Sequence, residues 1–290
     1  MKVTVTAPAK INLSLDIIGK RDDGYHLLNM ILQSVELCDT VTVWENGGGG
    51  IELTCNRDDL PTGEENLAFR AAALFFEENG LENPGISIRI KKRIPVGAGL
   101  AGGSTDAAAV LLALDRITGA GLTGFQLAEL AARLGADVPF CLQGGTMQAE
   151  GTGTILTPLP DLVECHMVLA KPDFSVSTAE AYALSDKHVR IRHPDLDEIV
   201  GAICGGDLEA VGRELYNAFE AVLRLEEVEK IKKIMRVHGA LGACMSGSGP
   251  TVFGLFAGRG EAEDCADELR EYYDEVYLCM PRGAGCEIEE

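Results

Sequence analysis

The chain is short of positive charge. It has 25 lysine and arginine residues against 45 aspartate and glutamate residues, which gives a formal net charge of −20. A negative charge of this size repels nucleic acids and anionic membrane surfaces, so we expect neither as a partner. Any anionic small-molecule substrate must instead be met by a local group of hydrogen-bond donors. The sequence gives no indication of the oligomeric state.

Paired cysteines are also missing. The nine cysteines are an odd number, are scattered along the chain and form no C-x-x-C pair. They show no spacing with histidine that would suit a metal, and His166, His188, His193 and His238 have no partner spacing either. We therefore predict reduced thiols in a cytoplasmic protein and assign no residue to a metal site.

No long apolar run occurs. A membrane-spanning helix needs about 20 apolar residues, and no segment approaches that length. The chain opens with the alternating strand pattern of residues 1–6 in place of a signal peptide. We expect a soluble, unprocessed protein, and 290 residues with 46% hydrophobic content suffice for two lobes.

The order of elements is typical of an α+β protein. Strands are predicted at residues 2–7, 13–18, 30–37, 40–44, 51–55, 86–94, 146–148, 154–156, 166–170, 242–245, 251–256 and 275–279. Helices are predicted at residues 67–79, 105–118, 124–134, 178–184, 196–203, 228–237 and 260–273. Pro158 and Pro160 suggest a boundary near 157–163, and therefore domains at 1–160 and 161–290. Residues 287–290 are interpreted as a solvated chain end.

The most informative segment is a glycine-dense loop that runs from Pro95 to Thr105 directly into a strong helix. Glycine lets the backbone approach an anion closely, and the first N–H groups of a helix point at it. The segment therefore predicts a phosphate site. A plain glycine-rich turn is the alternative, but four glycines between residues 97 and 103 cost more chain entropy than a simple turn requires.

Two well-known phosphate loops do not fit this segment. A P-loop ends in Gly-Lys-Ser/Thr, whereas Gly103 is followed by Ser104 with no lysine. Gly97, Gly99 and Gly102 do spell a dinucleotide fingerprint. However, Pro95 interrupts the junction with the strand, and a helix at 124–134 occupies the place of the second strand that a Rossmann unit needs.

Two further blocks raise the specificity of the loop. Residues 7–13 (APAKINL) carry a lysine and an amide just after the first strand, and residues 242–251 (GACMSGSGPT) form a second glycine and serine loop. Together the three blocks resemble the GHMP small-molecule kinase family. Residues 21–26 (RDDGYH) and 134–140 (LGADVPF) resemble the branch of that family that phosphorylates the 2-hydroxyl of a cytidine diphospho-sugar alcohol in the non-mevalonate isoprenoid pathway.

The resemblance implies a two-lobed fold with the active site between the lobes. The N-terminal lobe would be similar to ribosomal protein S5 and would bind ATP, and the C-terminal lobe would be α/β. Two departures from the family pattern occur. Residues 151–154 (GTGT) lack an acidic residue that relatives often have, so nothing is assigned there, and Ser104-Thr105 stands where two serines are common.

The resemblance also implies the catalytic pair, Lys10 and Asp137. Asp137 lies in an apolar setting and would accept or orient the proton of the substrate hydroxyl. Lys10 would pair with it and stabilise the phosphate or the developing alkoxide. The alternatives are a helix-ending aspartate with local backbone bonds and a surface lysine.

The binding residues implied by the resemblance form two sets. ATP would be bound by Asn66, Pro95, Val96, Gly97, Ala98, Gly99, Leu100, Ala101, Gly102, Gly103, Ser104 and Thr105. Substrate would be bound by Asn12, Tyr25, His26, Asp137 and Thr178. Tyr25 and His26 could stack on cytosine and bond its edge, whereas Asn66 and Thr178 could equally be helix caps.

ATP is the implied cofactor, with Mg²⁺ as its counter-ion. The alternatives left open are another kinase of the same family that acts on mevalonate, homoserine or a sugar, and a non-catalytic nucleotide-binding relative. The residues at 25 and 26 argue for the cytidine substrate, and the presence of both Lys10 and Asp137 argues for catalysis.

Overall fold

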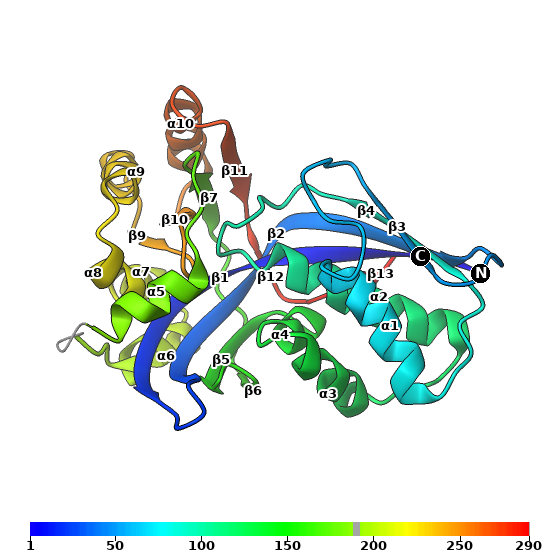
Figure 1. The fold of residues 1–290 in the computed structure, drawn as a ribbon. Helices are drawn as coiled ribbons and strands as arrows, with labels where there is room; N and C mark the ends of the chain where they lie inside the picture. The colour runs from blue at the N-terminus through cyan, green and yellow to red at the C-terminus, as the bar shows by residue number, and fades with distance from the viewer. Residues whose placement is uncertain (188–191, 290) are drawn as a thin grey trace.

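Two long antiparallel strands, β1 (Lys2–Lys20) and β2 (His26–Glu45), run through the centre of the molecule (Figure 1). The computed structural model describes residues 1–187 and 192–289, so His188 lies outside the described residues. Each long strand was predicted as two shorter ones, which was wrong. Register shifts near Pro8 and near Asn12 interrupt the alternation of side chains without ending β1. Lys10 and Asn12 therefore lie inside a strand.

The first sheet is built around these two strands. Its main path is β13-β1-β2-β4-β3, with β3 at Ile51–Cys55, β4 at Ile86–Lys91 and β13 at Glu287–Ile288. β3 and β4 are parallel and are joined by α1 (Leu67–Asn79), which makes a βαβ unit. β5 (Thr146–Gly151) pairs with β2 and with β6 (Ile155–Pro158). Together with the helices described next, this sheet confirms the predicted α+β class.

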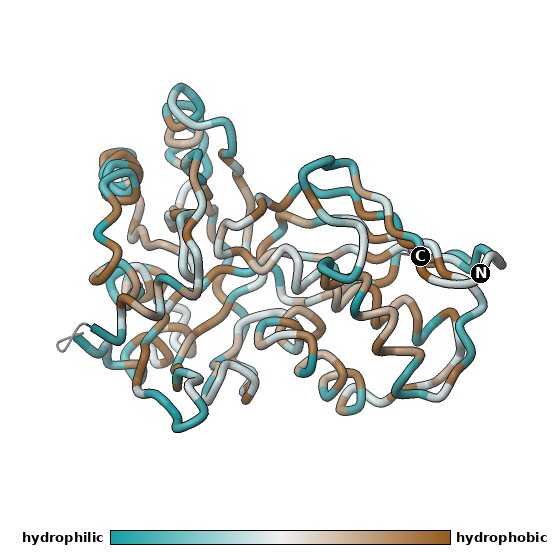
Figure 2. Tube along the Cα trace, viewed as in Figure 1, coloured by the Kyte–Doolittle hydropathy of each residue, from teal (hydrophilic) through white to brown (hydrophobic). Residues whose placement is uncertain are grey.

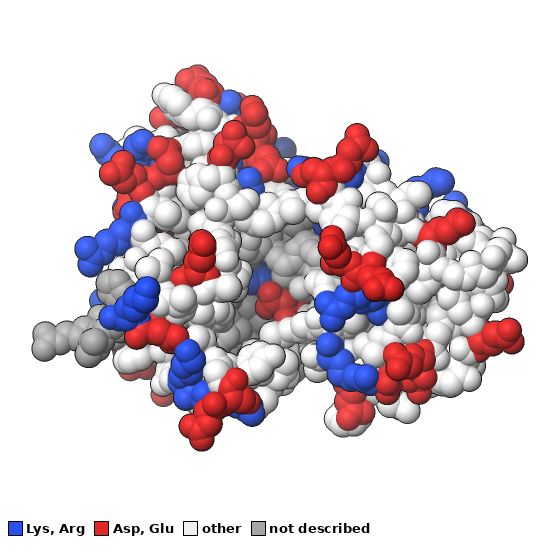
Figure 3. Space-filling view, in the orientation of Figure 1, with Lys and Arg blue, Asp and Glu red and all other residues white. Residues whose placement is uncertain are grey.

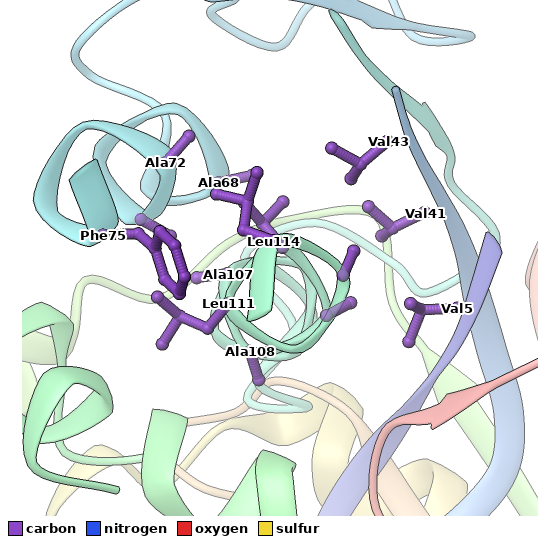
Figure 4. Close-up of a cluster of buried hydrophobic side chains, with 14 of the residues drawn as sticks. Val5, Val41, Val43, Ala68, Ala72, Phe75, Ala107, Ala108, Leu111 and Leu114 are labelled. Atoms are coloured by element: carbon purple, nitrogen blue, oxygen red, sulfur yellow. The ribbon is translucent and has the colours of Figure 1, made fainter. Parts of the chain in front are cut away.

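Four helices cover this sheet, three of them in contact with its strands and α3 packed on the other three. They are α1, α2 (Gly102–Thr118), α3 (Gly124–Leu134) and α4 (Val138–Gln143). Figure 4 shows Ala107 and Leu111 of α2 beside Phe75 of α1, with Val5 and Val41 of the strands on the other side. Small alanines let α2 lie deep in the core, with nine of its residues buried. α4 was missed because six residues are too few to show a helical period.

The second sheet belongs to the other half of the molecule. Its order is β11-β7-β10-β9, with bounds Glu275–Cys279, His166–Lys171, Val252–Phe256 and Gly242–Met245. Its helices are α5 (Thr178–Ser185), α6 (Leu196–Gly205), α7 (Leu208–Arg213), α8 (Ala218–Leu223), α9 (Glu226–Val237) and α10 (Arg259–Arg270). In Figure 2, the strands of this half are largely hydrophobic and its outer turns hydrophilic.

The two halves share strands. β8 (Tyr216–Asn217) pairs in parallel with β1, and β12 (Pro281–Arg282) pairs with β2. β13 (Glu287–Ile288) pairs with β1, opposite Val5 and Thr6. Glu287 and Ile288 are solvated, as interpreted from the sequence, but the strand that they form was not predicted. Their side chains are exposed, but their backbone completes the edge of the sheet, which places the two termini close together (Figure 1).

Candidate active site

A cavity of about 800 Å³ opens where the two halves meet. Figure 3 shows it as a hollow at the centre of the molecule with basic and acidic atoms at its floor. Nearly all of the predicted site residues line it: Lys10, Asn12, Tyr25, His26, Asn66, residues 95–104, Asp137 and Thr178. Segments that are far apart in the sequence thus meet at one place.

The glycine loop, residues 95–101 of the structure, forms one wall. Gly97 and Gly99 have positive φ angles of 61° and 75°, which favour glycine. A Cβ on Gly99 would collide with the carbonyl group of Ser246, so the two loops touch through backbone. Ala101 precedes α2 and supplies no side-chain cap. The first N–H groups of α2 therefore remain available at the cavity wall for an anion.

Thr105 is the one predicted ATP-binding residue that does not line the cavity. Its side chain is fully buried, and its hydroxyl lies 3.5 Å from the thiol of Cys286 in the C-terminal segment. Ser104, one residue earlier, does line the cavity. Both residues carry a hydroxyl group, and the sequence alone could not tell which of them faces the cavity.

Lys10 lies in β1 and Asp137 is the residue just before α4, and the fold brings their side chains together. Lys10 Nζ lies 3.8 Å from Asp137 Oδ2 and donates a hydrogen bond of 2.8 Å to Asn12 Oδ1. Lys10 is buried with 4% exposure, while the side chain of Asp137 is 36% exposed to the cavity. A fixed ammonium therefore lies beside a carboxylate that a ligand can reach.

The late glycine and serine loop holds these parts together. Gly247 N donates to Asn12 Oδ1 at 3.0 Å, and Ser246 Oγ donates to Gly99 O at 2.9 Å. Ser248 Oγ and Thr178 Oγ1 lie 2.8 Å apart. Thr178 is not the cap of α5, because Ser177 accepts the N–H of Glu180 instead. The loop thus connects β1, the glycine loop and α5 at the cavity.

An aromatic group forms another part of the lining. The ring of His26 stacks on Tyr182 with centroids 4.4 Å apart and planes 16° apart, and Tyr182 meets Phe219 edge to face. His26 Nε2 lies 2.6 Å from Asp186 Oδ1, which fixes the ring. Tyr25 is 66% exposed at the rim. Burial raises the pKa of Tyr182 to about 12, so its hydroxyl stays neutral.

Sequence reasoning missed several lining residues. Tyr182, Thr152, Lys92 and Asp106 all face the cavity. An aromatic in a helix is more often part of the core, so Tyr182 gave no distinct signal. Asn66 does line the cavity, but its side chain accepts from Ala68 N at 2.9 Å and donates to Pro61 O at 2.8 Å. Both ends of that amide cap α1 and hold the preceding loop.

Neither a metal cluster nor a membrane span is found in the part of the chain that the structure describes. No group of three or more His, Cys, Asp or Glu side chains there could hold a metal ion. No helix there is long and apolar enough to cross a membrane. All nine cysteines have free thiols.

Comparisons with known proteins agree with this geometry. A family model described as GHMP kinases N terminal domain matches residues 66–145, and one described as GHMP kinases C terminal matches residues 199–275. The chain is 45% identical to 4-diphosphocytidyl-2-C-methyl-D-erythritol kinase of Clostridium botulinum (strain Alaska E43 / Type E3), over 94% of this chain and 98% of that protein. It is 43% identical to the protein of the same name from Alkaliphilus metalliredigens (strain QYMF), over 96% of each. A crystal structure of 4-(cytidine 5'-diphospho)-2C-methyl-D-erythritol kinase superposes with a TM-score of 0.82 at 36% identity, covering 98% of this chain and all of that one.

Proposed function

The chain belongs to the GHMP kinase family, and we propose that it uses ATP to phosphorylate the 2-hydroxyl of 4-diphosphocytidyl-2-C-methyl-D-erythritol. This reaction is a step of non-mevalonate isoprenoid precursor biosynthesis. The observation that carries the proposal is that one cavity combines the glycine loop, the Lys10–Asp137 pair and the aromatic group of Tyr25, His26 and Tyr182. The glycine loop suits the phosphates of a nucleotide, the Lys10–Asp137 pair suits a reacting hydroxyl, and the aromatic group suits a pyrimidine.

Asp137 and Lys10 carry the proposed chemistry. The substrate hydroxyl attacks the γ-phosphorus of ATP, its O–P bond forms as the bond to the β-phosphate oxygen breaks, and ADP leaves. Asp137 takes the hydroxyl proton, for which its exposed carboxylate is suited. Lys10, held by Asn12, stabilises negative charge on the transferred group and on the attacking oxygen.

The glycine loop and the start of α2 are the proposed phosphate site. N–H groups at a helix start attract anions, and the glycines leave room for a close approach. This site supplies the local donors that a chain with a net charge of −20 needs for an anionic ligand. Both ends of the Asn66 amide are already bonded, one to Pro61 O and the other to Ala68 N. Asn66 would therefore act by holding the loop before α1 in place at the cavity wall.

The aromatic group is the proposed cytidine site. A pyrimidine gains about 1–3 kcal/mol from stacking on an aromatic side chain. Tyr182 provides a partly buried face held by its contacts with His26 and Phe219, and the rim position of Tyr25 allows it to close over a base. His26 has one ring nitrogen bonded to Asp186, which leaves the other for the base edge.

Mg²⁺ would arrive as part of the MgATP substrate. The described residues form no cluster that could hold a metal alone, so we propose that phosphate oxygens supply most of its ligands. The ion would offset phosphate charge during transfer.

We also propose a cytoplasmic location, since nine free thiols suit a reducing compartment.

The test is an ADP-release assay that compares the cytidine diphospho-sugar alcohol with mevalonate and homoserine. We expect turnover of the cytidine substrate alone. Equal turnover of the other alcohols would overturn the proposed specificity.

For the phosphate site, Gly102→Val and Ser104→Ala should weaken ATP binding more than binding of the cytidine substrate, because both residues line the glycine-loop wall.

A further inference from the structure

Three buried charged side chains lie at the base of the glycine loop. They are Asp39 on β2, Lys92 just after β4 and Asp106 on α2, and we call them the loop clamp. Lys92 Nζ donates to Asp39 Oδ2 and, at 2.8 Å, to Asp106 Oδ2. The three side chains are at most 6% exposed. Lys92 follows the strand that precedes the glycine loop, and Asp106 lies on the helix that follows it. The bond from Lys92 to Asp106 thus connects the two ends of the loop.

The two carboxylates of the loop clamp are bonded unequally. Asp39 Oδ1 accepts the backbone N–H groups of Arg93 at 2.5 Å and Ile94 at 2.9 Å, in addition to the bond from Lys92 to its other oxygen. Among the residues that the structure describes, Asp106 accepts only from Lys92, and its Oδ1 is buried without a partner. Three donors stabilise the charged form of Asp39, whereas one donor supports that of Asp106.

The charges in the loop clamp do not balance unless one carboxyl is protonated. One ammonium faces two carboxylates, and burying the second negative charge is costly. Asp39 accepts from three donors and Asp106 from one, so the proton belongs on Asp106. In agreement, burial raises the pKa of Asp106 to about 8, with Asp39 adding to the effect and Lys92 opposing it. The same two carboxylates raise the pKa of Lys92 although burial alone would lower it, so the ammonium stays charged.

Other titratable groups near Asp106 do not compete in this range. The thiol of Cys55 lies at the end of β3 and that of Cys286 in the C-terminal segment. Burial raises the pKa of Cys55 above its usual value and that of Cys286 to about 12. Asp106 is therefore the member of this group that changes charge near neutral pH.

The loop clamp is next to the proposed phosphate site. Lys92 and Asp106 line the same cavity as the glycine loop. Lys92 Nζ lies 3.0 Å from the position that a Cβ on Gly102 would take, which puts it directly behind the first turn of α2. A second negative charge at this point would repel the triphosphate and pull Lys92 away from Asp39.

We propose that Asp39, Lys92 and Asp106 are positioning residues that hold the glycine loop in its ATP-binding shape, and that they do so with Asp106 protonated. The proposal rests on ATP being the phosphoryl donor. It assigns the loop clamp a role in nucleotide affinity and in the pH range of the enzyme, whereas Lys10 and Asp137 act on the reacting groups.

The test measures the Kd of ATP without the acceptor from pH 7 to pH 9.5 for the unchanged protein and for Asp106→Asn. The asparagine has the shape and neutrality of the protonated acid and keeps an acceptor for Lys92. ATP affinity of the unchanged protein should fall about tenfold over this range, while that of Asp106→Asn should vary less than about threefold. Asp106→Ala, which loses the bond to Lys92, should bind ATP more weakly at every pH, and the KM of the acceptor should stay constant in both variants.

A parallel fall in both proteins would overturn the proposal. So would a tenfold loss for Asp106→Asn at pH 7, because the site would then depend on the ionised carboxylate. If Asp106→Asn does not fold, calorimetry of the unchanged protein at pH 8.5 in two buffers of different ionisation enthalpy decides the question. Proton uptake on ATP binding is expected, and its absence would refute the proposal. Absence of ATP binding by folded protein at pH 7 would instead count against the proposed function.

Discussion

The ammonium of Lys10 lies 3.8 Å from Oδ2 of Asp137, too far for a strong direct hydrogen bond, while Asn12 holds it at 2.8 Å. Lys10 is therefore positioned independently of Asp137. The carboxylate keeps free lone pairs and is open to the cavity, so a substrate hydroxyl could enter beside both groups.

Asp137→Asn keeps the shape of the side chain and removes the base. We expect kcat to fall by ~10²–10⁴-fold. ATP binding should remain, since the glycine loop and the loop clamp are untouched. Steady-state kinetics together with nucleotide titration provide the check. Near-normal turnover in a folded variant would remove Asp137 from the mechanism.

Lys10→Ala removes a preorganised positive group and should lower kcat by ~10²–10³-fold. The double variant with Asp137→Asn should lose less than the product of the single losses, because the two groups act as a unit. Strictly multiplicative losses in the complete double-mutant cycle would mean that the two side chains act separately.

Tyr182→Leu should raise the KM of the cytidine substrate about tenfold, because one stacked base is worth about 1–3 kcal/mol. The KM of ATP should change little. Tyr182→Phe is the matched control, since it keeps the ring that stacks on His26 and removes only the hydroxyl. A loss of equal size in the phenylalanine variant would show that the hydroxyl, and not the ring face, matters.

Gly99→Ala should destabilise the protein on the order of 2–4 kcal/mol. The residue has a φ angle of 75°, and a Cβ would collide with the carbonyl of Ser246. Gly103→Ala is the control, because a Cβ there would meet nothing closer than Leu67 Cδ1 at 3.7 Å. Urea unfolding without nucleotide separates the two. Equal midpoints would contradict the tight contact between the loops.

Stability should depend on pH through Asp106. Its pKa rises from the usual 3.8 to about 8 on folding, so the folded state binds more protons between these values. The resulting contribution to the free energy of unfolding is complete below about pH 4 and is lost as pH rises toward about 8. Asp106→Asn should lack this loss, so its stability relative to the unchanged protein should increase from pH 5 to pH 8. Urea midpoints that shift in parallel in the two proteins would contradict this.

The sequence predicted most elements, and nearly all of the site residues that it predicted line the cavity, for identifiable reasons. Glycine spacing and the apolar run after it identify the loop and α2 physically, whereas Lys10, Asp137, Tyr25 and His26 were found through family blocks. Where the structure differs, local patterns carried no signal. The register shifts in β1 and β2 break the alternation that marks a strand.

The sequence also could not show which way a side chain points or which distant residues meet in the fold. Ser104 and Thr105 are adjacent and both carry a hydroxyl group, yet only Ser104 faces the cavity. Asp39 and Asp106 are 67 residues apart in sequence, and only the packing of α2 on the sheet brings both to Lys92. The pairing of Glu287 and Ile288 with β1 joins backbone groups, and a strand of two exposed residues is too short to give a periodic pattern.

The pairing of β13 with β1 has a consequence for synthesis of the protein. The strand Lys2–Lys20 is synthesised well before its neighbour Glu287–Ile288, which comes much later in the chain. Until then, the nascent chain carries an open sheet edge that can pair with another copy. The first sheet is therefore completed only after residues 287–288 have been synthesised, and a gene split between the lobes would yield an N-terminal fragment with that edge permanently exposed.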